Sequence, residues 1–347
     1  RTFAEKWIEV HKDQFKRLGV VGDWENYYST MSYDAEAQIV RELGKFLKEG
    51  SLYRGFKPVL WSTVEKTALA DAEVEYKDHK SDTIYACFPI KSSKIRELND
   101  CNIVIWTTTP WTLPGNVGLA VGPDVTYVRV KITAPPSDSW EGRGGSPIEE
   151  ELILAKDLMS TVLRHQVEVI DEFPGSNLVG MSYQPLFEGA IDGSNHPAAW
   201  TIVGADFVTT TDGTGVVHTA VMYGEDDYNL GMKEGFPAQH TVGMDGRFVE
   251  GTHMQLDGRY VKDCDSDIID LLAEQNSLYR EHTYTHDYPH CWRTDHPLLY
   301  YAMDSWFVRM TAVKERLLEF NDGVEWAPDW VLSLIHISEP TRRYAIS

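Results

Sequence analysis

The segment from Trp106 to Asn116 restricts the fold of this chain more than any other. It contains four threonines, two prolines and a glycine, and it directly follows the apolar run 103–105, which predicts a buried strand. Pro110 has no backbone N–H and favours an extended conformation at Thr109, so little helix is expected here. We predict a strand end and a turn that displays hydroxyls and backbone amides. Such a turn suits the binding of a small polar group, although a Thr/Pro-rich turn that binds nothing is the simpler alternative.

A second polar cluster, residues 213–228, combines a short strand with a helix start. The strand 216–218 ends at His218, and a helix is predicted to begin after Gly224 with three carboxylates in its first turn: Glu225, Asp226 and Asp227. Taken alone, a histidine on an apolar strand is usually a core residue, and first-turn carboxylates stabilise the helix dipole. Their combination with the threonine segment favours a pocket for a small polar ligand, in which a carboxylate could bind an ammonium group.

Residues 1–50 are predicted to be helical. The clearest helix runs from Asp34 to Glu49, and five apolar side chains fall on one of its faces: Ile39, Val40, Leu43, Phe46 and Leu47. Ser32 or Asp34 is expected to cap its start, and Gly50 can serve as the residue just past its end. We interpret this segment as an ordinary core-facing helix.

The pattern changes to short strands from residue 101 to about 280. Predicted strands cover residues 125–132, 151–155, 167–170, 200–203, 207–210 and 216–219, with Gly, Pro and Asp at the turns between them. This pattern predicts a β-barrel-like domain with a few helices. Residues 55–100 are expected to form a short β-rich connector.

The composition is that of a globular chain. Apolar residues make up 42% and charged residues 24% of its 347 residues, which is ample for a core, and the length suggests two or more domains. Four widely spaced cysteines indicate reduced thiols and a cytoplasmic location. No apolar run approaches the roughly 18 residues that span a bilayer, so no membrane partner is expected. The net charge of −21 argues against non-specific nucleic-acid binding by the whole surface.

The threonine segment closely resembles the signature of the editing domain of isoleucyl-tRNA synthetases. Leucine and valine enzymes typically carry an arginine before the proline, where this chain has Thr109, and Trp111 also points to the isoleucine branch. Further segments resemble the family in family order: residues 19–24, 55–59, 67–76, 213–218, 224–228 and 288–293. The resemblance extends from about residue 1 to about residue 330.

This resemblance implies an α/β and β-rich fold, in which a β-barrel-like editing domain is inserted into a partial Rossmann-type catalytic domain. We expect a helical catalytic part at 1–54, the connector at 55–100, the editing domain at 101–280 and a return to the catalytic domain at 281–331. Residues 332–347 resemble a translated sequencing adapter and are expected to be a non-native tail. The chain is therefore expected to be an internal fragment of a longer enzyme.

The resemblance also implies roles for individual residues. Asp227 matches the aspartate that recognises the α-amino group, and His218 matches the histidine that helps set the pocket size. The expected catalytic set is Asp227, His218, Thr107, Thr108 and Thr109. The expected substrate-binding set is Thr112, Asn116, Asp226 and Trp111. The run 220–223 departs from the family, because Val221 replaces a proline and Met222 is bulkier than the usual residue. A looser turn is therefore expected there.

The implied chemistry is post-transfer editing, the hydrolysis of valine from mischarged tRNA(Ile), because a binding pocket rejects a missing methylene only weakly. A bound water is the expected nucleophile, since the sequence shows no persuasive Ser-His-Asp or Cys-His signature. The parent enzyme would ligate isoleucine to tRNA(Ile) with ATP. This chain lacks the two nucleotide-binding motifs of that reaction, so it should not activate isoleucine itself.

Zinc is not expected. Relatives with a zinc site carry two Cys-x-x-Cys pairs, whereas this chain has Ser62 to Glu65 at the first position and only Cys291 at the second. The expected partners are tRNA(Ile), isoleucine and valine, and the chain is expected to be a monomer. Two alternatives stay open: a non-catalytic tRNA-binding or structural remnant, and the editing region of a valyl or leucyl enzyme.

Overall fold

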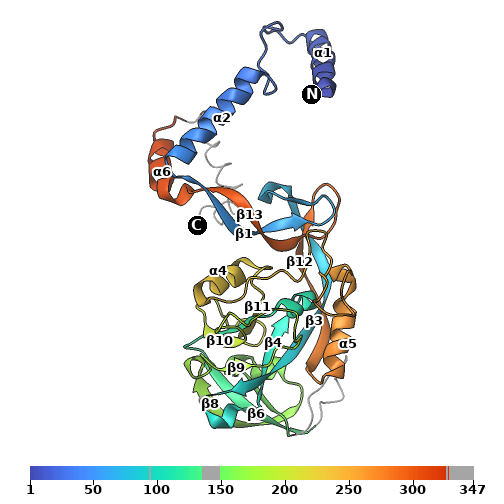
Figure 1. Ribbon diagram of the computed structural model, residues 1–347, viewed down its shortest axis with the longest axis vertical. Coiled ribbons are helices and arrows are strands. Elements are labelled where there is room, and N and C mark those ends of the chain that lie inside the picture. Colours follow the sequence, from blue (N-terminus) through green and yellow to red (C-terminus); the bar gives the residue numbers. More distant parts are fainter. Residues whose placement is uncertain (94, 135–148, 326, 328–347) are drawn as a thin grey trace. The chain divides into compact units, whose positions relative to one another are not determined.

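The computed structural model describes residues 1–93, 95–134, 149–325 and 327. The chain forms two compact units (Figure 1). The smaller unit comprises residues 1–55 and those from 304 on, and the larger unit comprises residues 56–303. The non-native tail predicted at 332–347 lies outside the described residues. The domain boundaries predicted at 54, 100, 280 and 331 remain predictions.

The smaller unit is helical, and its helices bury little. It contains α1 (Thr2–Arg17), α2 (Tyr33–Lys48), the 3-10 helix η7 (Met310–Val313) and α6 (Lys314–Asp322). The predicted cap of α2 is confirmed, because Ser32 Oγ accepts a hydrogen bond from the Ala35 N–H at 3.3 Å. Its predicted core-facing side is not buried: Ile39, Val40, Leu43, Phe46 and Leu47 are 44–68% exposed. The spacing of the apolar residues therefore predicts the helix correctly, but it does not predict whether the apolar face is buried.

Two long strands run between the units. In a three-stranded sheet, β1 (Leu52–Ser62) lies between β13 (Leu299–Val308) and the short β2 (Thr67–Ala68). The chain enters the larger unit along β1 and leaves it along β13. The β-rich character predicted for residues 55–100 agrees with these strands and with the long strand that follows them.

The larger unit is built on a ten-stranded mixed sheet. Nine strands follow the order β11-β5-β10-β9-β3-β4-β7-β6-β8, and β12 pairs with β3. Their bounds are β3 Val74–Ser92, β4 Asn102–Thr107, β5 Gly118–Val121, β6 Thr126–Ala134, β7 Glu151–Ala155, β8 Gln166–Pro174, β9 Ser182–Tyr183, β10 Thr201–Gly204, β11 Val216–Thr219 and β12 Leu278–Cys291. Apolar side chains of this sheet, including Phe88, Ile103 and Ile105, are fully buried and form one continuous core.

The sheet curls without closing into a barrel. The turn before β11 approaches the end of β7, where the Ala155 N–H donates to the Thr214 carbonyl at 2.9 Å. The Tyr127 hydroxyl also donates to the Gly215 carbonyl. Within the described residues, however, no ladder joins the end strands β11 and β8. The sheet-rich α/β fold class is confirmed, whereas the closure suggested by a barrel does not occur in this part of the chain.

The remaining helices of the larger unit are short. They are α3 (Met159–Val162), α4 (Glu225–Glu234) and α5 (Asp265–Glu274). The 3-10 helices are η1 (Asp71–Glu73), η2 (Arg96–Leu98), η3 (Pro110–Gly115), η4 (Lys156–Leu158), η5 (Gly175–Asn177) and η6 (Val261–Asp263). Helix α5 packs along β3 and β12 (Figure 1). In the described part of the chain, no helix is long and apolar enough to cross a membrane.

One predicted strand is wrong. Residues 207–210 form turns and irregular backbone rather than a strand. The preceding strand β10 pairs with β5 as far as the register Gly204–Val121. Beyond it, Gly204 lies against the ring of Pro123, and proline has no N–H with which to extend a ladder.

Candidate functional site

The threonine segment begins at the end of a buried strand and continues as a 3-10 helix. Thr107 is the last residue of β4, and η3 covers Pro110–Gly115. The expectation of little helix is therefore wrong for these six residues. Pro110 occupies the first helical position, where a missing N–H costs nothing. The Thr112 N–H donates to the Thr109 carbonyl at 3.0 Å, which closes the first turn.

The threonine side chains are organised by hydrogen bonds within the segment. The Thr107 hydroxyl accepts from the Thr109 N–H at 3.1 Å and lies 3.3 Å from the Thr109 hydroxyl. Thr107 and Thr112 are buried, whereas Thr108 and Thr109 are partly exposed. The hydroxyls that remain accessible are therefore those of the two residues between the strand and the helix.

His218 joins this segment from a strand more than one hundred residues away. Its Nε2 lies 2.9 Å from the Thr112 hydroxyl, which donates its own proton to the Thr109 carbonyl at 2.8 Å. Since a hydroxyl has one proton to donate, His218 must donate from Nε2. This fixes the neutral tautomer with an acceptor at Nδ1, an atom that is buried and has no partner among the described residues. Burial lowers the pKa of His218 to about 4, so the ring is neutral at physiological pH.

Backbone pairing brings the two parts of the site together. In the antiparallel pair of β11 and β5, His218 lies opposite Leu119. The Val117 N–H, directly after the threonine segment, donates to the Thr219 carbonyl at 2.9 Å. The juxtaposition of the histidine with the threonines therefore depends on the core of the sheet and not on a mobile loop.

Asp227 lies in the first turn of α4 and is held against the end of β11. Its carboxylate accepts a hydrogen bond from the Ala220 backbone, two residues after His218. Burial raises the pKa of Asp227 to about 7, the Ala220 contact opposes this shift, and nearby Asp226 adds to it. A Cβ at Gly224 would lie 2.1 Å from Asp227 Oδ2, so any larger residue there would displace the carboxylate.

The neighbouring acidic residue differs from Asp227. Asp226 is exposed on the surface of α4. Among the described residues, Asp227 makes no hydrogen bond to a threonine of the segment; the two are connected through β11. The structure thus places Thr107, Thr109, Thr112 and His218 in one hydrogen-bonded group and ties Asp227 to the same strand.

Asn116 and Trp111 are buried within the protein. The Asn116 amide group donates to the Gly118 carbonyl at 3.0 Å, and its Oδ1 accepts from the Tyr183 hydroxyl at 2.6 Å. The Trp111 ring packs edge-on against Tyr223, with centroids 5.2 Å apart. In this structure both side chains hold the segment in place, and the substrate contacts predicted for them remain predictions.

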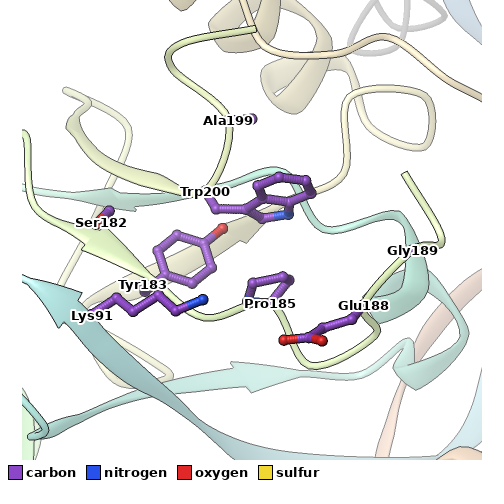
Figure 2. A pocket seen from close by; sticks show the side chains of 8 residues that line it. All are labelled: Lys91, Ser182, Tyr183, Pro185, Glu188, Gly189, Ala199 and Trp200. Atoms are coloured by element: carbon purple, nitrogen blue, oxygen red, sulfur yellow. The ribbon is translucent and has the colours of Figure 1, made fainter. Parts of the chain in front are cut away.

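A pocket of about 350 Å³ lies beside Tyr183 and Trp200 (Figure 2). These two aromatic residues line it together with polar side chains that include Lys91 and Glu188. The Trp200 indole N–H donates to the Asn116 carbonyl at 3.2 Å. The two aromatic residues of the cavity therefore also anchor the end of the threonine segment.

The run that departs from the family folds into a firm turn. The Tyr223 N–H donates to the Ala220 carbonyl at 2.9 Å, and residues 220–223 are all buried. The Tyr223 hydroxyl accepts from the backbone N–H groups of Thr241 and Val242 at 2.7 and 2.8 Å. The looser turn expected from the loss of proline is not observed, because Tyr223 anchors this turn to a distant loop.

The two positions at which zinc-binding relatives carry Cys-x-x-Cys pairs hold other side chains in this chain. Among the described residues, no group of three or more His, Cys, Asp or Glu side chains could hold a metal ion. At the first knuckle position, Ser62 donates to Glu65, and this hydrogen bond holds the pKa of Glu65 at about 2. Cys291 Sγ lies 3.6 Å from Glu65 Oε1. These residues do not fit the tetrahedral N/S donor set of structural zinc.

Comparisons with known proteins identify relatives for almost the whole chain. The family model described as tRNA synthetases class I (I, L, M and V) matches residues 1–338. The isoleucine–tRNA ligase of Pelagibacter ubique is 46% identical over 336 residues, which are 95% of this chain and 36% of that protein. The corresponding ligase of Aquifex aeolicus is 37% identical and covers 95% of this chain and 35% of its own length. The chain thus spans about a third of the length of these relatives.

The similarity of this chain to solved structures is weaker than its similarity to these ligase sequences. The editing domain of the Plasmodium knowlesi cytosolic leucyl-tRNA synthetase superposes with a TM-score of 0.41 at 10% identity, covering 59% of this chain and 97% of that domain. The resemblance inferred from the sequence motifs is confirmed by the family model and the matched ligases. The chain belongs to the class I tRNA synthetases of the isoleucine, leucine, methionine and valine group.

Proposed function

We propose that this chain carries the editing site of an isoleucyl-tRNA synthetase and hydrolyses valine from mischarged tRNA(Ile). One observation carries the proposal: the hydrogen-bonded group of three threonines and a neutral histidine, with a half-buried carboxylate tied to the same strand. The 46% identity to an isoleucine–tRNA ligase supports the choice of isoleucine over leucine or valine.

Asp227 is suited to bind the α-ammonium of the amino acid ester. Without a ligand, burial raises its pKa to about 7, so the carboxylate is only partly ionised near neutrality. An adjacent ammonium would favour the ionised form and form charge-assisted hydrogen bonds. Binding should therefore improve as the pH rises through about 7. Asp226 is exposed and would contribute through its charge alone.

His218 and the threonines would hold the rest of the ester. The bulk of the His218 ring, held by Thr112, would limit the size of the amino-acid side chain that fits. The hydroxyls of Thr108 and Thr109 can donate to the ester carbonyl oxygen. Thr107 and Thr112 would keep these groups in place, because their own hydroxyls are engaged inside the segment.

The proposed reaction is hydrolysis by water. The water oxygen attacks the ester carbonyl carbon, the bond to the ribose oxygen breaks, and valine and the free tRNA end are released. With a pKa of about 4, His218 is a weak base and is poorly suited to deprotonate the water. The described residues show no Ser-His-Asp or Cys-His arrangement at this site.

The whole parent enzyme is proposed to ligate isoleucine to tRNA(Ile) with ATP in the cytoplasm, acting as a monomer. ATP would supply the energy for that ligation, at a site formed by motifs that this sequence lacks. Editing needs no ATP, so this chain should deacylate tRNA without it and give no ATP–pyrophosphate exchange.

A deacylation assay with Val-, Thr- and Ile-charged tRNA(Ile) tests the proposal. The chain should release valine fastest and spare isoleucine, and Asp227→Ala should slow the release of valine by about 100-fold, as expected for loss of a charge-assisted contact. Asp226→Ala is the matched control, and it should retain most of the activity. Undiminished hydrolysis by Asp227→Ala would refute the assignment.

The same assay separates the two alternatives. A structural remnant would hydrolyse none of the three charged tRNAs, although it could still bind them. The editing region of a valyl or leucyl enzyme would act on a different tRNA and spare Val-tRNA(Ile). Thr109 and Trp111 disfavour the second alternative.

A further inference from the structure

Two aspartates in the first turn of α5 have contrasting surroundings. The carboxylate of Asp265 accepts a hydrogen bond from the backbone N–H of Trp111 at 3.0 Å, across 154 residues of sequence. Asp267 instead pairs with Arg259 at 2.8 Å on the surface. Only the first of these residues contacts the threonine segment.

The Asp265 carboxylate contacts the threonine segment at the start of η3, where a backbone N–H has no acceptor within the helix. The first N–H groups of a helix have no partner within it. In η3 the first residue, Pro110, has no N–H, so the N–H of Trp111 is the first to need an external acceptor. Asp265 supplies it, and α5 packs directly against η3. The start of η3 is thereby fixed to a helix whose inner face is fully buried at Ile268 and Leu272.

The fixed start of η3 lies one residue from the contact with His218. Trp111 precedes Thr112, whose hydroxyl accepts from His218 Nε2 and thus fixes the tautomer of that ring. A shift at the start of η3 would move Thr112 and weaken this contact. Asp265 itself lies outside the hydrogen-bonded group and acts on it through the backbone.

The pKa of the Asp265 carboxylate is shifted in the direction opposite to that of a carboxylate in a surface ion pair. Burial raises its pKa to about 7, an effect that Lys262 and the Trp111 N–H oppose and Asp82 adds to. The carboxylate is therefore costly to keep ionised, unlike Asp267, whose pKa Arg259 lowers. Perturbed carboxylates of this kind concentrate at functional sites.

We propose that Asp265 is a positioning residue of the editing site, which holds the start of η3 so that Thr112 orients His218. This inference rests on the proposed editing function and adds to it a residue outside the threonine and aspartate motifs. Asparagine at this position would keep a side-chain oxygen able to accept from Trp111, whereas alanine would not.

The kinetic test compares Asp265→Ala, Asp265→Asn and the control Asp267→Ala in Val-tRNA(Ile) deacylation by the full chain. We expect Asp265→Ala to lower kcat about ten-fold with KM changed by less than about two-fold, as for loss of one hydrogen bond to a charged group. Asp265→Asn should recover most of kcat, and Asp267→Ala should match the unmodified chain. Equal losses in Asp265→Ala and Asp265→Asn, or a loss that follows a lowered Tm, would overturn the proposal.

Amide hydrogen exchange of residues 106–116 gives a second test that needs no activity. Asp265→Ala should speed exchange in this segment about ten-fold, while Asp265→Asn and Asp267→Ala leave it unchanged. Unchanged exchange in Asp265→Ala would contradict the inference. If the unmodified chain fails to deacylate Val-tRNA(Ile), the proposed function fails, whereas the exchange result still decides whether Asp265 holds η3.

Discussion

The two units of this chain bury their apolar side chains to very different extents. In the larger unit, β4 and its neighbours place Ile103 and Ile105 in a core with no exposure to solvent. In the smaller unit, α1 and α2 have no buried residue. In both units, the local sequence pattern predicts the secondary structure correctly. The difference shows that a periodic apolar face predicts a helix, whereas only packing against other elements gives it stability.

The same contrast explains where the candidate site is found. Burial raises the pKa of a carboxylate and lowers that of a histidine, and among the described residues only the larger unit has buried positions. Asp227, His218 and Asp265 all belong to it. The acidic residues of α1 and α2 lie on exposed helices and make surface ion pairs such as that of Lys45 with Glu42.

The largest expected difference between the units is in amide hydrogen exchange. Amides of β3, β4 and β12 should exchange at least about 1,000-fold more slowly than those of α1 and α2, because opening the larger unit exposes its whole core. Exchange followed by mass spectrometry on the full chain measures both at once. Equal protection of the two helices and the sheet would break the comparison.

A matched pair of truncations should show a smaller but still clear difference. Ile105→Ala should lower the free energy of unfolding of the larger unit by about 3 kcal/mol, because it leaves a cavity in a packed core. Leu43→Ala, at a side chain that is 51% exposed, should change stability by less than about 0.5 kcal/mol. Denaturant titration of both variants tests this. A large loss for Leu43→Ala would show that its helix face is covered in solution.

The pH dependence of Asp227→Asn should separate function from stability. The pKa of Asp227 is raised from 3.8 to about 7 in the folded chain, so its burial costs little at pH 4 and costs most above pH 7. Replacement by asparagine should therefore stabilise the larger unit by about 2 kcal/mol at pH 8, roughly a 5 °C rise in Tm, and by little at pH 4. Deacylation should be lost in the same variant.

Thermal unfolding at both pH values, with the exposed Asp226→Asn as control, measures this effect. A gain in stability that is as large at pH 4 as at pH 8 would show that the charge of Asp227 is not its cause.

The smallest expected effect concerns the cap of α2. Ser32→Ala removes the acceptor for the Ala35 N–H and should destabilise this helix by about 0.5 kcal/mol, at the low end for such caps because the bond is 3.3 Å long. Amide exchange in residues 33–48 should rise while α5 stays unchanged. A change that extends into the larger unit would show that the two units unfold together.

Much of the fold could be predicted where the signal is local. The helix predicted at 34–49 is α2 at 33–48, and the strands predicted at 151–155 and 216–219 have the bounds of β7 and β11. Alternation and capping residues act over a few positions and can be read directly. The predictions at 207–210 and at η3 were wrong because both segments depend on residues elsewhere in the chain. Pro123 lies where the ladder between β10 and β5 ends, and hydrogen bonds from other elements stabilise the short helix η3.

The site divides in the same way. The threonine segment, His218 and Asp227 could be singled out because each stands in a short pattern that resembles a known family. Asp265 and Tyr223 could not be singled out in this way, because their hydrogen-bond partners lie elsewhere in the chain. Trp111 is 154 residues from Asp265, and Thr241 is 18 residues from Tyr223. No spacing rule connects such pairs, and only the packing of α5 and of the 220–223 turn reveals them.

The pairing of β1 with β13 in one sheet has a consequence for how such proteins change over time. The chain crosses between its two units at Gly55 and at Asp304, and an ion pair between Arg54 and Asp304 joins the two strands there. A module whose entrance and exit are adjacent can be exchanged, enlarged or deleted while the rest of the polypeptide keeps its path. The proposed editing function could in this way be acquired or lost together with one module, without redesign of the remaining protein.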